Sequence, residues 1–80
     1  MLLLKKEIED RLTILKNVKG LTKHNDIWNL QQLITNYSLL MTLIDTTESI
    51  DKNLVKNYII SLDEEYEYYE KQKYNRENVF

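Results

Sequence analysis

The sequence predicts an all-α protein, an antiparallel three-helix bundle with up-down-up topology. The 80 residues include no proline and one glycine, so almost nothing in the chain interrupts a helix. Apolar residues recur at spacings of three and four in three separate segments. The segments between them, around 20–25 and 45–49, are short enough to make consecutive helices antiparallel. We therefore expect one helical domain over 1–80, about 30 Å long at 1.5 Å per residue.

The first helix is expected over residues 2–19. Its apolar residues fall on one face at helical spacing: Leu4, Ile8, Leu12, Leu15 and Val18. Gly20 follows this segment, and a glycine adopts the left-handed conformation that ends many helices at little cost. The pattern thus predicts a helix whose C-terminal cap is Gly20.

The second helix is expected over residues 26–45, with Asn25 as its N-cap. One apolar seam follows alternating steps of three and four: Ile27, Leu30, Ile34, Tyr37, Met41 and Ile44. A second apolar set extends far round the same helix: Trp28, Leu33, Leu39, Leu40 and Leu43. A helix that is apolar over most of its circumference has to be covered on several sides. We therefore expect this helix to be the central one.

The third helix is expected over residues 49–73, with Thr47 or Ser49 as its cap. Its buried stripe is predicted from the same spacing: Leu54, Val55, Tyr58, Ile59, Leu62, Tyr66 and Tyr69. Residues 75–80 show no apolar pattern, and we expect them to fray.

Self-association is expected because a chain of this length buries a modest core. There is no cysteine, which excludes disulfides and thiolate zinc sites. The first and third helices are expected to cover two sides of the second helix. Trp28, Leu39 and Leu43 lie near the edge of the covered area. These three residues are the predicted interface of a homo-oligomer, or else an apolar patch for a different protein.

We expect no catalysis, no cofactor and no metal. The only histidine, His24, is assigned to a solvent-exposed loop, away from any serine in a strained turn. One glycine cannot build a phosphate-binding loop. Dimetal sites in helical bundles use Glu-x-x-His, which this sequence lacks.

Charge is unevenly distributed along the chain. Residues 1–44 carry six basic and four acidic groups, whereas 45–70 carry two basic and eight acidic groups. No segment has the pattern of a secretory signal or the length of a membrane span, so we expect a cytoplasmic protein with no membrane partner. The abundance of Lys, Asn, Ile and Tyr is typical of AT-rich genes, and suggests a low-GC bacterium or its phage as the source.

The segment 63–70 holds five carboxylates and three tyrosines. Acids on an exposed face steer a basic partner, and tyrosine is a favoured interface residue. The residues predicted to bind a partner are Asp63, Glu64, Glu67, Tyr68 and Glu70. That partner is a basic protein, and if it binds nucleic acid the acidic face could imitate DNA phosphates. The alternative is an ordinary solvated helix face.

These features favour a small non-catalytic interaction module, such as a regulator, inhibitor or assembly factor that binds another protein. One alternative is a transcriptional regulator that binds nucleic acid through residues 19–32, although direct nucleic-acid binding is disfavoured by the acidic balance and the apolar second helix. The other alternative is a structural subunit that forms homo-oligomers.

Overall fold

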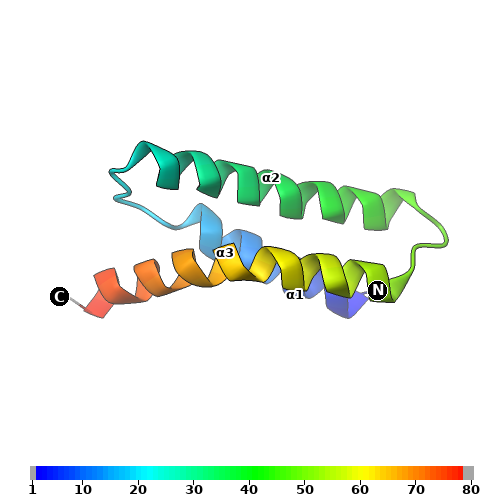
Figure 1. Ribbon diagram of the computed structural model, residues 1–80. Helices are drawn as coiled ribbons and strands as arrows, with labels where there is room; N and C mark the ends of the chain where they lie inside the picture. Colours follow the sequence, from blue (N-terminus) through cyan, green and yellow to red (C-terminus); the bar gives the residue numbers. More distant parts are fainter. Residues whose placement is uncertain (1, 79–80) are drawn as a thin grey trace.

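The computed structural model is an all-α three-helix bundle, which confirms the predicted fold class. It describes the backbone of residues 2–78 and the side chains of residues 2–71. Helix α1 spans Leu2–Lys16, α2 spans His24–Thr46 and α3 spans Lys52–Asn78. The chain runs up, down and up, and each helix packs against both others (Figure 1). The bundle measures 45 × 23 × 17 Å, longer than predicted because α3 has 27 residues.

The core lies along the common axis of the three helices. Its buried members are Leu4, Ile8, Leu15, Leu33, Tyr37, Leu40, Ile44, Val55, Ile59, Tyr66 and Tyr69. The contribution of α1 matches the predicted face. Helix α2 is rotated from the predicted seam, because Leu33 and Leu40 are buried whereas Ile27 is 37% exposed. On α3 the prediction was wrong for Leu54 and Tyr58, which are 66% and 51% exposed.

Helix α1 ends earlier than its apolar pattern does. The backbone N–H groups of Asn17 and Val18 donate to the carbonyls of Ile14 and Leu15, three residues back, which tightens the last turn. Gly20 has a φ of 76°, the left-handed conformation expected for it. It lies in the connection to α2, four residues past the end of α1, and so does not cap that helix directly.

The helix N-termini also differ from the sequence expectation. Helix α2 begins one residue before Asn25, and its N-cap Lys23 makes no side-chain cap hydrogen bond. Helix α3 is capped by Asp51, whose Oδ1 accepts the backbone N–H of Asn53 at 2.8 Å. Asp51 thereby satisfies one unpaired donor and places a negative charge at the positive end of the helix dipole.

The C-terminal part of α3 is helical to Asn78, which includes most of the segment expected to fray. Residues 79 and 80 lie outside the part that the structure describes. Within that part, none of the helices combines the length and the apolar character needed to cross a bilayer.

Candidate interaction surface

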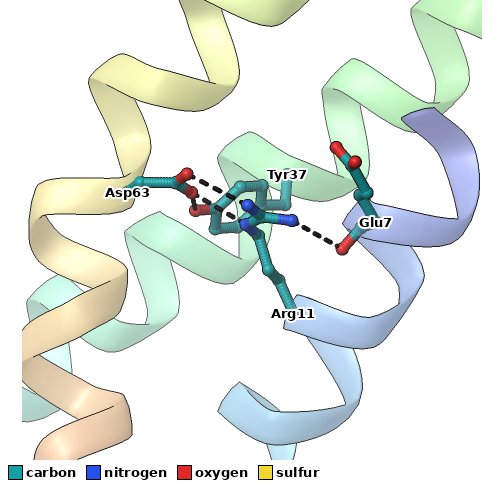
Figure 2. Close-up of polar contacts among 4 residues, drawn as sticks. All are labelled: Glu7, Arg11, Tyr37 and Asp63. Atoms are coloured by element: carbon teal, nitrogen blue, oxygen red, sulfur yellow. Dashed lines mark hydrogen bonds and ion pairs between the residues drawn. The ribbon is translucent and has the colours of Figure 1, made fainter. Parts of the chain in front are cut away.

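One polar cluster, made by Arg11, Tyr37 and Asp63, joins all three helices (Figure 2). The Arg11 guanidinium on α1 donates two hydrogen bonds to the Asp63 carboxylate on α3, at 2.8 and 3.0 Å. A third guanidinium nitrogen donates to the backbone carbonyl of Glu7 at 3.0 Å. The Tyr37 hydroxyl on α2 donates to Asp63 Oδ1 at 2.9 Å. Asp63 is therefore the common acceptor at the point where the helices meet.

The polar cluster is partly buried. The Arg11 and Asp63 side chains are 21% and 24% exposed. Burial opposes the charge on Arg11, but the hydrogen bond and charge of Asp63 outweigh it and raise the pKa of Arg11 above its usual value. Burial, followed by the hydrogen bond to Asp63, raises the pKa of Tyr37 well above its usual value. At neutral pH Arg11 therefore stays charged and the Tyr37 hydroxyl stays protonated, so both remain hydrogen-bond donors to Asp63.

The ring of Tyr66 packs against two members of the polar cluster, Arg11 and Tyr37. Arg11 lies over this ring, with its guanidinium carbon 5.5 Å from the centroid, and Tyr37 meets the ring edge-on at 6.4 Å. Burial, and then a hydrogen bond to Glu70, raise the pKa of Tyr66. Two of the residues predicted to bind a partner, Asp63 and Glu70, are thus engaged by groups of this chain. Arg11 was not among the predicted site residues, because its partner Asp63 lies 52 positions away in the sequence.

An acidic groove lies between the start of α2 and the middle of α3. It encloses about 310 Å³ and is lined by Asp26, Asn29, Glu64, Glu65, Tyr68 and Tyr69. The Tyr68 hydroxyl donates to the two carboxylate oxygens of Asp26 at 3.2 and 3.3 Å. The Tyr69 hydroxyl donates to the Asp26 backbone carbonyl at 2.8 Å. Two tyrosines therefore fasten α3 to the first turn of α2.

The two tyrosines have different surroundings. Tyr69 is buried and meets the Tyr68 ring edge-on at 5.1 Å, whereas Tyr68 is 44% exposed. Burial, and then the charge of Asp26, raise the pKa of Tyr69 to about 12. Of the predicted partner-binding residues, the acidic groove unites Glu64 and Tyr68. It adds Asp26, Asn29 and Glu65, which the prediction omitted.

An apolar groove lies further along the same side of the α2–α3 pair. It encloses about 340 Å³ and is lined by Asn36, Leu39, Leu40, Leu43 and Tyr58. Leu39 is 61% exposed and Leu43 is 49% exposed. Both were predicted to form an interface, and Tyr58 faces them from α3. Tyr58 was assigned to the core because helical spacing alone does not distinguish a buried stripe from its margin.

Besides Asp63 and Glu70, two further predicted residues lie outside both grooves. Trp28 is 62% exposed, and it precedes Leu39 by eleven residues, which is three helical turns. It therefore lies on the same strip of α2 as the apolar groove. Glu67 is exposed, but it does not line the acidic groove.

Metal ligands do not gather among the described side chains. None of them form a group of three or more His, Asp or Glu that could hold a metal ion. His24 is exposed at the first turn of α2. Lys23 and Asn25, which belong to the predicted nucleic-acid contact, are also exposed there, and neither of them lines the acidic groove.

Comparison with known proteins does not place the chain in a family. Neither the family models, nor the curated proteins, nor the solved structures give a match.

Proposed function

We propose that this protein is a non-catalytic interaction module that regulates, inhibits or assembles another protein by covering part of its surface. The observation that carries the proposal is the apolar groove. Leu39, Leu43 and Tyr58 come together from two helices, and each keeps about half or more of its surface exposed. Contiguous exposed apolar side chains are typical of surfaces that bind other proteins.

The core supports this proposal because it does not need these side chains. Leu39, Leu43 and Tyr58 belong neither to the buried core cluster nor to the partly buried residues packed against it. No buried side-chain polar atom in the described part of the chain lacks a hydrogen-bond partner. The exposed apolar residues therefore contribute little to folding, and binding gives them a physical role.

The test is a pull-down from lysate of the native host cells, with three forms of the full chain used as bait. They are the wild type, the double variant Leu39→Glu/Leu43→Glu and the control Ile60→Glu. Ile60 is also an exposed apolar residue, at 65%, but it lies on the α1–α3 side beside Lys56 and Asp63. We expect one partner to be recovered with the wild type and with Ile60→Glu, and to be lost with the double variant. Equal recovery by all three forms would refute the proposal.

A structural homo-oligomer is a second candidate, because the same apolar groove could meet a second copy of the chain. Sedimentation of the wild type at two concentrations tests this. A mass that rises with concentration for the wild type, but not for Leu39→Glu/Leu43→Glu, would favour the homo-oligomer.

A further inference from the structure

The acidic groove and the apolar groove lie along one side of the α2–α3 pair, and together they define a single elongated surface. Both grooves take residues from α2 and from α3. From Asn29 in the acidic groove to Leu43 in the apolar groove is fourteen residues along α2, or about 21 Å at 1.5 Å per residue. A helix of four turns has this length.

Among the described side chains, the charged groups that line this surface are all acidic. Three carboxylates line the acidic groove, from Asp26, Glu64 and Glu65, and no lysine or arginine of residues 2–71 lines either groove. Helix α2 contains no lysine or arginine at all. Lys52 and Lys56 of α3 line cavities on the opposite side, with residues of α1. The surface therefore combines an apolar half with an acidic half.

We infer that this surface binds an amphipathic helix of another protein, with an apolar stripe over one half and lysine or arginine side chains over the other. Leucine-like side chains of that helix lie in the apolar groove against Leu39, Leu43 and Tyr58. Its basic residues lie over Glu64 and Glu65. Helices that bind in grooves use this division between apolar anchors and charged flanks. The inference rests on the proposed function and specifies the chemistry of the partner.

A second copy of this chain fits the same surface less well. If two copies met through a twofold axis, the acidic groove would face either itself or the apolar groove of its partner. Neither arrangement supplies a cation to Glu64 and Glu65. Charge complementarity therefore favours a foreign basic helix over self-pairing.

The test uses three synthetic 14-residue helical peptides and the full chain. In the first two, one half carries leucine at i, i+3 and i+4, and the other half carries lysine on the same face, with the two halves in either order. In the third, glutamate replaces every lysine. Binding is measured by fluorescence anisotropy at 0.05 and 0.5 M NaCl. We expect one lysine peptide to bind at least tenfold more tightly than the glutamate peptide, and to weaken severalfold at high salt.

Variants locate the binding on the protein. Leu39→Glu/Leu43→Glu should abolish binding, Ile60→Glu should retain it, and Glu64→Lys/Glu65→Lys should reverse the preference toward the glutamate peptide. Circular dichroism confirms that each variant keeps its helical content. The inference is overturned if the lysine and glutamate peptides bind equally, if Ile60→Glu weakens binding as much as the groove variant does, or if the wild type self-associates through the grooves instead. Each of these results leaves the lysate assay as the separate test of the proposed function.

Discussion

The polar cluster of Arg11, Tyr37 and Asp63 gives the most demanding test of the structure, since one substitution affects all three helices. Asp63→Ala removes the acceptor of the Tyr37 hydroxyl and of both Arg11 hydrogen bonds. Tyr37 as a whole is fully buried, so its hydroxyl has little access to replacement water. Leaving a buried donor unpaired costs about 1–2 kcal/mol. The Arg11–Asp63 pair is partly exposed, which limits its contribution to about 1 kcal/mol.

The expected loss in free energy of unfolding is thus about 2–3 kcal/mol for Asp63→Ala. For a domain of this size, that lowers the Tm by roughly 10–20 °C. Thermal unfolding followed by circular dichroism, together with urea titration, measures both quantities. A double-mutant cycle with Arg11→Met should give a coupling energy of about 1 kcal/mol, because neither single variant retains the ion pair.

The matched control is the ion pair between Lys5 and Asp45, which also joins two helices but is more exposed, at 30% and 52% of the side chains. Lys5→Met should lower the free energy of unfolding much less than Asp63→Ala does, because solvent screens this exposed pair. The reasoning fails if Asp63→Ala is as mild as Lys5→Met, or if the cycle gives no coupling. Either result would mean that Asp63 points to solvent, as the sequence alone suggested for the acids of α3.

Three further predictions concern the core, a helix cap and pH. Leu33→Ala, at a fully buried site, should lower the free energy of unfolding in urea by about 2–5 kcal/mol. Leu54→Ala, at an exposed site, should change it by no more than about 0.5 kcal/mol. Equal losses would contradict the observed rotation of the helices. Asp51→Ala should lower the free energy of unfolding by about 1 kcal/mol, because it removes the N-cap of α3. Asn25→Ala inside α2 should leave the free energy of unfolding unchanged. The opposite order would mean that Asn25 is a helix cap, as the sequence predicted, and that Asp51 is not. Raised tyrosine pKa values mean that the folded chain keeps phenol protons that the unfolded chain loses near pH 10, so stability should be intact below pH 10 and fall as pH rises toward 12, the value for Tyr69. Unfolding midpoints that stay constant from pH 9 to 12 would exclude this linkage.

The fold was predictable because its determinants are local. The absence of proline and the three-four spacing specify three helices, and short connections make them antiparallel. The buried face of α1 was also predictable, because all three of its buried residues belong to the predicted apolar stripe. Leu4, Ile8 and Leu15 are all buried, as the spacing requires.

The rotation of α2 was not predictable from its spacing, because several faces of this helix are apolar enough to be buried. A rotation of α2 about its axis that buries Leu33 in place of Ile27 exchanges one apolar side chain for another, so the buried apolar area changes little. What distinguishes the observed orientation is specific: Tyr37 reaches Asp63, and Asp26 receives Tyr68 and Tyr69. Such contacts join residues 26 to 43 positions apart, and no local pattern reports them.

The acidic segment was misjudged in one respect for the same reason. On a single helix, its carboxylates look equivalent, and all were expected mainly on the solvent side. In the bundle these carboxylates have different neighbours. Asp63 accepts hydrogen bonds from Arg11 of α1, whereas Glu64 and Glu65 line the acidic groove beside α2. The candidate site therefore depends on the neighbouring helices, which a pattern within one helix does not identify.

Stability and the proposed binding are consequently attributed to different sides of the bundle. The cation that reaches the carboxylates of α3 comes from α1, so charge compensation is concentrated on that side of the helix. The opposite side keeps Glu64, Glu65, Leu39 and Leu43 without a cation or an apolar cover among the groove-lining residues. A polar residue at Leu39 or Leu43 would fold equally well and would be better solvated, so folding gives no reason for leucine there. A partner that brings both apolar side chains and positive charge would account for the two features at once.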